Sequence, residues 1–127
     1  MADLEANKRL AESFLDVALN QRDPARAVVD YLAAGYIQHN PRASDGGEAF
    51  LAWANWRLGQ CPEYRVEFKR TVAEGDLVVA HTHHIDAPDS PGLVVVDIFR
   101  VAENKLAEHW DVIQPVPAES SNPNGMF

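Results

Sequence analysis

The chain has 127 residues, of which 46% are hydrophobic and 24% charged, and this predicts one globular domain over residues 1–127 with one hydrophobic core. Its net charge of −8 and its scattered Lys and Arg residues argue against a nucleic-acid-binding protein, because phosphate contacts need a basic surface. No apolar run approaches the roughly 20 residues that cross a membrane, and no secretory signal is recognisable. The single cysteine, Cys61, fits a reducing compartment. We therefore expect a cytoplasmic protein without nucleic-acid or membrane partners.

The first third of the sequence predicts two helices. Residues 4–21 place apolar side chains at helical spacing on one side and charged side chains on the other. A second helix is predicted to begin at Asp23, an N-cap followed by a proline, and to end before Gly35. The residues of this second helix that we expect to face the core are Val28, Val29 and Leu32.

A short extended segment and a third helix follow. Residues 36–41 predict extended backbone, since the residue before Pro41 avoids the helical conformation. The third helix is predicted to begin at Asp45, because Glu48 three residues later completes a capping-box pattern, and to end at Gly59. All three helices are therefore predicted in the first half of the chain.

The second half predicts four strands, joined by tight turns at residues 74–76 and 102–104 and by a longer loop at residues 87–92. The predicted strands are residues 64–73, 77–86, 93–101 and 105–113. Residues 115–127, with their prolines and a glycine, predict an irregular tail. Helices followed by an antiparallel meander indicate the α+β class.

Two carboxylates, Asp97 and Asp111, interrupt strands that otherwise read as buried. Alternation along the strands puts them on one face, and the turn at residues 102–104 places Asp97 opposite His109, with Asp111 one same-face step further, roughly 5 to 8 Å away. A buried carboxylate must be paired, hydrogen-bonded or protonated, and burial makes it a good acid or base near neutral pH. We expect this pair to form the centre of an enzyme pocket. The alternatives are that Asp111 and His109 satisfy backbone groups at a strand end, and that Asp97 only holds His109 in position.

Histidines provide further candidates. His39 lies between the predicted helices and the sheet, where clefts open in α+β proteins, and is either a catalytic residue or a hydrogen-bonded loop residue. In the predicted strand 77–86, His81 and His83 share one face and are candidates for the pocket, whereas His84 points the other way.

The His-x-His pattern in that strand also resembles the metal-binding box of cupins, because Gly75 precedes it at the matching distance. The cupin box requires a later glutamate, and this chain has Ala87 or Pro88 at that place. We therefore expect no bound metal, with a metal enzyme kept as a third hypothesis.

Four segments carry a family resemblance: residues 36–41, 73–79, 96–100 and 105–112. In these residues the chain resembles the SnoaL-like polyketide cyclases of the nuclear transport factor 2-like superfamily. The resemblance implies a cone-shaped, cystatin-like α+β barrel, in which three N-terminal helices pack on a strongly curved antiparallel sheet around an apolar pocket. It also implies a homodimer formed through the sheet.

The resemblance implies roles for both carboxylates. Asp111 matches the acid/base aspartate of the cyclases. Asp97 matches the protonated aspartate with which ketosteroid isomerases donate to an enolate oxygen, a place where cyclases tend to have a histidine. The base and the tyrosine donor of the isomerases have no match, and Arg100 has the wrong strand parity for the Asp-Arg-Asp arrangement of related epoxide hydrolases.

We therefore hypothesise a lyase or isomerase, without cofactor or metal, that catalyses an aldol cyclisation or an isomerisation of a small apolar carbonyl compound. Asp111 moves a proton at the carbon next to the carbonyl, and Asp97 with His39 or His83 hydrogen-bonds the enolate oxygen. The residues expected to contact the substrate are His83, His81, His109, Trp53, Tyr36, Phe14 and Phe99, and for Trp53 and Phe14 the alternative is a place in the hydrophobic core. The alternative from another class is a non-catalytic, small-ligand-binding module of the same fold.

Overall fold

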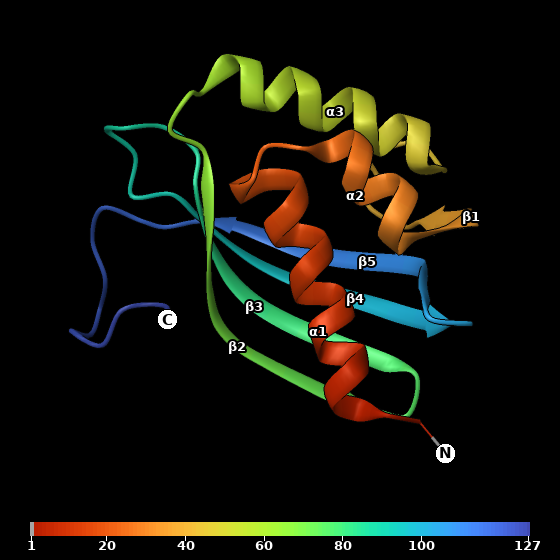
Figure 1. Ribbon diagram of the computed structural model, residues 1–127. Coiled ribbons are helices and arrows are strands. Elements are labelled where there is room, and N and C mark those ends of the chain that lie inside the picture. The colour runs from red at the N-terminus through yellow and green to blue at the C-terminus, as the bar shows by residue number, and fades with distance from the viewer. Residues whose placement is uncertain (1) are drawn as a thin grey trace.

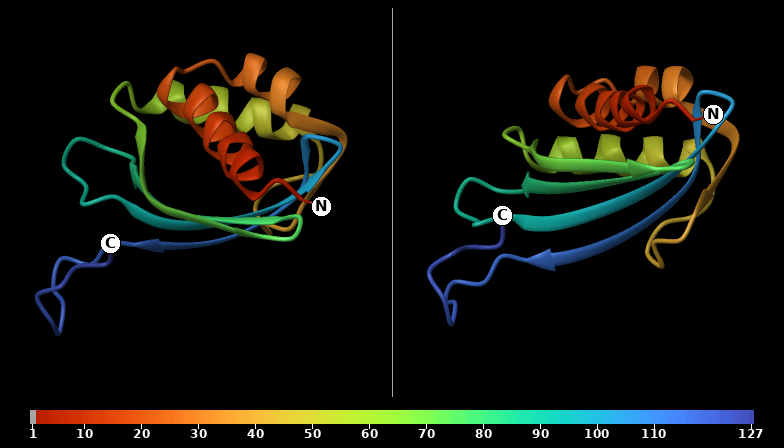
Figure 2. Two further views of the ribbon diagram at one scale, coloured as in Figure 1. Left: turned by 60° about the horizontal axis from the view of Figure 1, so that its bottom comes forward. Right: turned by 90° about the horizontal axis from the view of Figure 1, so that it is seen from below.

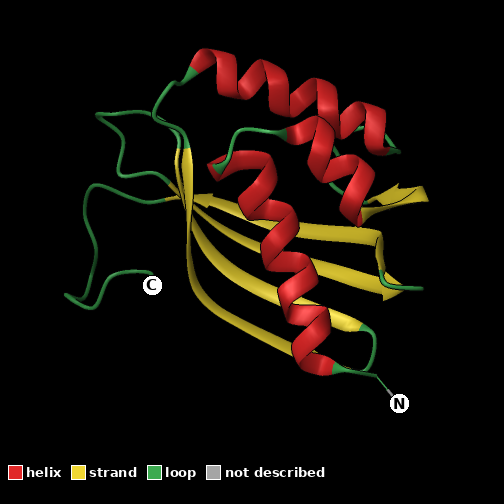
Figure 3. Ribbon diagram, in the orientation of Figure 1, coloured by secondary structure: helices red, strands yellow, loops and turns green. Residues whose placement is uncertain are grey.

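The computed structural model describes residues 2–127, which form three α-helices and five strands (Figures 1 and 3). The helices are α1 (Leu4–Leu15), continued by a π-helical turn (Asp16–Asn20), α2 (Pro24–Tyr31) and α3 (Gly47–Gln60). The strands are β1 (Leu32–Gln38), β2 (Arg65–Glu74), β3 (Leu77–Ile85), β4 (Leu93–Ala102) and β5 (Lys105–Pro115). The sheet curves round the helices, which confirms the α+β cone (Figure 2). Within the described residues, no helix combines the length and the apolar character needed to cross a membrane.

The first helix begins where Asp3 caps it, since the Asp3 carboxylate accepts a hydrogen bond from the Ala6 N–H at 3.0 Å. The helix was predicted as one α-helix over residues 4–21, and its last turn is π-helical instead. This turn ends at Asn20, whose amide donates to the Val66 carbonyl at 3.0 Å and accepts from the Val66 N–H at 2.8 Å. The side chain of Asn20 therefore holds the end of the first helix against β2.

The second helix begins as predicted, with Asp23 accepting from the Arg26 N–H at 3.1 Å. It ends at Tyr31, earlier than predicted, and Leu32 already belongs to β1. Ala27 is fully buried and Val28 packs against the core, so Val29, which points about 200° away from Ala27 round the helix, is directed to solvent. Val29 is 75% exposed, and the prediction that it faces inward is wrong.

The third helix begins two residues later than predicted. Gly46 stands at its N-cap with φ +93°, a left-handed value that favours glycine. Asp45 accepts instead from the Gln38 N–H, at 2.8 Å, and so joins the loop to the end of β1. The capping box that the sequence predicted is therefore absent here.

The strand order of the sheet is β1-β5-β4-β3-β2. The antiparallel meander from β2 to β5 follows the predicted strands within two residues at each end. The predicted extended segment at residues 36–41 overlaps only the end of β1, which begins four residues earlier, ends at Gln38 and pairs in parallel with β5. The sheet is therefore mixed, which corrects the expectation of a purely antiparallel one, and the β1 pairing brings Tyr36 and Gln38 beside the end of the meander.

The core lies between the concave face of the sheet and the helices. Phe14 of α1 is 1% exposed and meets the Phe99 ring of β4 edge to face, with 5.9 Å between ring centroids. Residues 116–127 contain neither helix nor strand, as predicted for the tail. The tail returns to the outer face of the sheet, where the Phe127 ring stacks on His83 with centroids 4.3 Å apart.

Candidate active site

A cavity of about 760 Å³ opens between the concave face of the sheet and helices α1 and α3. Its wall is mostly apolar, and Trp53 and Trp56 of α3 lie in it with 40% and 59% of their surface exposed. The volume falls in the range of sites for drug-sized ligands. The wall contains seven of the residues that the sequence singled out, which are Asp97, Asp111, His109, Tyr36, Trp53, Phe14 and Phe99.

Asp97 of β4 and Asp111 of β5 face each other directly across the two strands. The sequence predicted His109 opposite Asp97, and that register is wrong by one same-face step. The turn contributes one residue of this shift, because Ala102 pairs with Lys105, and a β-bulge contributes the other, because Arg100 pairs with Glu108 whereas Val101 pairs with Leu106. The face was predicted correctly, since a shift of two residues keeps every side chain on its side of the sheet.

The hydrogen bonds of His109 determine where its protons lie. Gln38 Oε1 accepts from the Asn40 N–H at 3.0 Å, so it is an acceptor, and His109 Nδ1 at 2.7 Å must donate to it. His109 Nε2 lies 2.7 Å from Asp97 Oδ1, a distance that requires a proton between the two atoms. The Asp97–His109 pair therefore holds one transferable proton, either on the imidazole or on the carboxyl group.

Asp111 has different partners. The Asn40 amide nitrogen lies 2.9 Å from Asp111 Oδ1 and 3.0 Å from Asp111 Oδ2. The orientation of this amide is fixed, because Asn40 Oδ1 accepts from the Arg42 N–H at 2.8 Å. Both oxygens of Asp111 therefore serve as hydrogen-bond acceptors. Asp111 is thus arranged as a base, and its Oδ2 lies 4.0 Å from His109 Nε2.

One oxygen of the site is left without a partner. Asp97 is 4% exposed, and its Oδ2 makes no hydrogen bond within residues 2–127. Buried polar atoms are nearly always satisfied in proteins, so an unsatisfied one in a cavity wall indicates where a ligand binds. Nearby, Tyr36 stacks on His109, with ring centroids 6.4 Å apart. Its pKa is raised by burial first and by the Asp97 charge second, so the phenol stays protonated.

A divalent cation could take one ligand atom each from Asp97, His109 and Asp111, because these atoms lie within 4.8 Å of one another. Both nitrogens of His109 are already occupied, however, one by Gln38 and the other by Asp97. A metal would have to break the Asp97–His109 hydrogen bond and displace its proton. The arrangement fits proton transfer better than metal binding.

His39 does not belong to this cavity. Its Nε2 lies 2.7 Å from Glu108 Oε2, and its ring stacks on Trp110 with centroids 4.8 Å apart. Hydrogen bonds from His39 first and from Arg100 second hold the pKa of Glu108 below its usual value. Glu108 and Trp110 alternate with His109 and Asp111 along β5 and therefore point to the outer face. The hypothesis that His39 contacts the substrate is corrected accordingly.

The histidines of β3 are also placed differently from the prediction. His84 is 5% exposed and lines the cavity, whereas His81 and His83 lie on the outer face, next to Arg70 and to the Pro91 carbonyl. The signal that could have identified His84 is the pairing across the predicted loop at residues 87–92. Pairing across that loop puts His84 opposite Leu93, on the face that carries Asp97.

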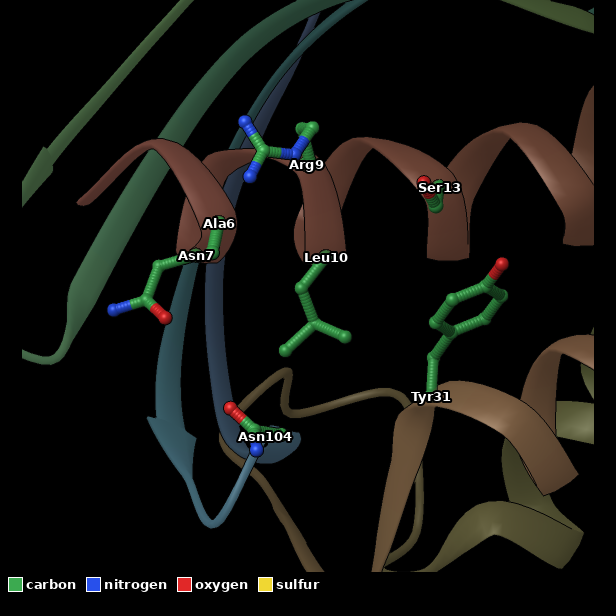
Figure 4. A pocket seen from close by; sticks show the side chains of 7 residues that line it. All are labelled: Ala6, Asn7, Arg9, Leu10, Ser13, Tyr31 and Asn104. Atoms are coloured by element: carbon green, nitrogen blue, oxygen red, sulfur yellow. The ribbon is translucent and has the colours of Figure 1, made fainter. Parts of the chain in front are cut away.

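A second, smaller hollow of about 380 Å³ lies beside α1 (Figure 4). Leu10 of α1, Tyr31 of α2 and Asn104 of the β4–β5 turn border it. No carboxylate lines this hollow, so it offers no second acid/base pair. The chemistry is therefore concentrated in the larger cavity.

Comparisons with known proteins agree with this fold. The family model described as SnoaL-like domain matches residues 11–109. TsrD from Streptomyces laurentii superposes with a TM-score of 0.74 at 26% identity, over 89% of this chain and 91% of TsrD. A Kribbella flavida protein provisionally named a ketosteroid isomerase gives a TM-score of 0.73 at 21% identity, over 98% and 87% of the two chains. A Bacillus cereus protein provisionally named a polyketide cyclase gives a TM-score of 0.74 at 17% identity, over 85% of this chain and 74% of the Bacillus cereus protein. The last two likenesses show the fold alone, and none of the curated proteins matches the chain.

Proposed function

The chain belongs to the SnoaL-like domain family, and we propose that it is an enzyme that enolises an apolar carbonyl compound by acid/base catalysis. One observation carries the proposal. Two carboxylates, Asp97 and Asp111, face each other in a mostly apolar cavity, and their hydrogen bonds suit one to hold a proton and the other to take one. Opposite environments for two titratable groups are the usual sign of an acid and a base in one site.

In the proposed reaction, the Asp111 carboxylate takes a proton from the carbon next to the carbonyl group. The electron pair of that C–H bond moves into the enolate, and negative charge develops on the oxygen. The Asp97–His109 pair stabilises this oxygen by a hydrogen bond or by transfer of its proton. In an aldol cyclisation, the enolate carbon then attacks a second carbonyl group of the same molecule, and the new alkoxide takes the proton from Asp111. In an isomerisation, Asp111 returns the proton to another carbon instead.

The cavity wall supports an apolar substrate. Phe14, Phe50 and Phe99 contribute rings to one cluster, with Phe14 and Phe50 centroids 4.8 Å apart and Phe14 and Phe99 centroids 5.9 Å apart. Aromatic walls exclude water from the reacting carbon, which strengthens the electrostatic interaction with a developing enolate. The substrate class that fits best is therefore an apolar ketone or a compound with several carbonyl groups.

Hydrogen exchange at carbon tests the first step without knowledge of the natural substrate. The purified protein is incubated in D₂O with an apolar methyl ketone, 2-undecanone, and deuterium incorporation next to the carbonyl is followed by NMR. We expect the Asp111→Asn variant to exchange at least about 100-fold more slowly than the wild type, the usual scale for a positioned base. Asp89→Asn is the matched control, because Asp89 is exposed in the β3–β4 loop and the change removes the same charge.

Two results would contradict the proposal. One is an Asp111→Asn variant that folds and exchanges as fast as the wild type. The other is a wild-type protein that binds ketones tightly without accelerating exchange in any member of a ketone panel. The second result would favour a ligand-binding module, in which the unsatisfied oxygen of Asp97 serves binding alone.

A further inference from the structure

The cavity contains a second unsatisfied polar atom, at some distance from the carboxylates. His84 of β3 is 5% exposed and lines the cavity, and its Nε2 makes no hydrogen bond to any part of the chain that the structure describes. The sequence pattern did not single out this residue, and the proposed reaction does not use it. An imidazole nitrogen buried in a cavity wall needs a partner, and the cavity is the direction from which a partner can come.

The other nitrogen of His84 identifies the tautomer. Tyr64 is 4% exposed, and its hydroxyl lies 2.6 Å from His84 Nδ1, whereas its other side-chain neighbour, Arg57, can only donate a hydrogen bond. If Nδ1 carried a hydrogen, the hydrogen of the buried phenol would have no acceptor. Tyr64 therefore donates to Nδ1, and the ring hydrogen of the neutral imidazole stands on Nε2.

The ring is neutral at physiological pH. Burial lowers the pKa of His84 to about 4, against smaller opposing effects of the Asp97 and Asp86 charges. The Tyr64 phenol stays protonated, because burial raises its pKa more than the positive charge of Arg57 lowers it. Arg57 lies over the Tyr64 ring, 5.4 Å from the centroid, and is itself paired with Asp86 at 3.4 Å. This end of the cavity therefore presents a neutral N–H donor, without an excess charge that would select an ion.

We propose that His84 Nε2–H forms a second subsite, which binds a neutral acceptor oxygen of the substrate away from the carbonyl group that is enolised. Only the statement about which oxygen reacts rests on the proposed function; the subsite itself rests on the geometry of His84 and Tyr64. The substrate class is then an apolar compound with two separated oxygens, one near Asp97 and Asp111 and one near His84.

The register of the sheet gives the separation of the two subsites. His84 pairs with Leu93, and Asp97 lies four residues further along β4. Four residues of strand span about 13 Å, and the concave curvature brings side chains closer together than that. A carbon chain of several atoms between the two oxygens is therefore required, and 1,2- or 1,3-dicarbonyl compounds are too short.

A matched pair of ketones tests the subsite by binding alone. 2-Undecanone and 2,10-undecanedione have the same carbon skeleton and differ only in the distant second carbonyl group. Quenching of the fluorescence of Trp53 and Trp56, which line the cavity, reports binding of both. We expect the wild type to bind the diketone roughly five- to tenfold more tightly, the scale of one neutral hydrogen bond. The His84→Leu variant should lose the preference for the diketone, because its second carbonyl group then enters the cavity without a donor, and His84→Gln, which keeps an N–H donor, should recover part of the preference.

His83→Leu is the matched control, because His83 is the next residue of the strand and lies on the outer face. Its preference should equal that of the wild type. If His84→Leu fails to fold, His84→Phe keeps a planar ring without the donor and makes the same test. A folded His84 variant of either kind that retains the full preference for the diketone overturns the proposal, and so does a wild type without any preference.

The outcome is separable from that of the proposed function. Asp111→Asn should lose hydrogen exchange and keep the preference for the diketone, because Asp111 lies at the other end of the cavity. If Asp111→Asn still catalyses hydrogen exchange, the acid/base role of Asp111 is contradicted, but the proposal of the His84 subsite is not affected. Loss of the preference in a His84 variant that still exchanges 2-undecanone supports the subsite independently.

Discussion

Burial of His84 in neutral form should make the folding stability fall as the pH is lowered, and His84→Gln should remove that part of the pH dependence. In the unfolded chain the imidazole has its ordinary pKa of 6.5, and in the folded protein burial lowers the pKa to about 4. Between these values the unfolded chain binds a proton that the folded protein does not bind. Acidification therefore favours unfolding across this window, and the contribution of His84 vanishes above it.

The size of the effect follows from the two pKa values. A shift of one pKa unit corresponds to about 1.4 kcal/mol. At pH 4 the unfolded imidazole is almost fully protonated and the folded one about half protonated, which destabilises the fold by about 3 kcal/mol relative to pH 7.5. That amount is a large part of the stability of an ordinary small domain.

Urea unfolding followed by circular dichroism, at intervals from pH 7.5 to pH 4, measures the effect. Other groups also titrate in this range, so the informative quantity is the difference between the wild type and His84→Gln at each pH. As the pH falls, we expect the free energy of unfolding of the wild type to decrease by about 3 kcal/mol more than that of His84→Gln. A constant difference across the range would refute the reasoning, because it would mean that the ring of His84 is equally protonated in both states.

Two further predictions concern the site boundary and the fold. His109→Gln should slow hydrogen exchange of 2-undecanone at least about 100-fold, because it removes the proton shared with Asp97. His39→Gln should leave the exchange rate within about twofold of the wild type, since His39 lies outside the cavity. Equal losses of rate in the two variants would argue against the cavity as the reaction site. Asp23→Ala should reduce the free energy of unfolding by about 1 kcal/mol, because the helix loses its N-cap, and Asp23→Ser should restore most of this stability. If the midpoint of urea unfolding is unchanged in Asp23→Ala, the cap contributes nothing to stability.

The sequence predicted what depends on local periodicity. Alternation along β4 and β5 was sufficient to put Asp97, Asp111 and His109 on one face, and the turn between the strands was sufficient to make them neighbours. The register was wrong by one same-face step, or two residues, because the turn is one residue shorter than predicted and a bulge opposite Arg100 and Val101 inserts an extra residue into β5. Bulges depend on how strands pack after pairing, and no local pattern indicated this one.

The parts that could not be predicted depend on contacts between distant residues. Gln38 and Asn40, which orient His109 and Asp111, reach the site only because β1 pairs in parallel with β5, about 70 residues later in the chain. The parity of β3 was ambiguous, because both of its faces contain histidines and apolar residues. The strand alone does not resolve this, and the pairing of β3 with β4 across the loop at residues 87–92 decides that His84 faces the cavity and that His83 does not.

The proton held by Asp97 and His109 also explains how two carboxylates coexist in this cavity. Two ionised carboxylates within 4.8 Å would repel each other by at least about 3.5 kcal/mol at an effective dielectric constant of about 20. A proton shared with His109 reduces the negative charge at Asp97, while the Asn40 amide stabilises the charge on Asp111. The hydrogen bonds that relieve the repulsion therefore also distinguish the acid from the base. Replacement of Asn40 or His109 should disturb both properties together, because the same contacts produce them.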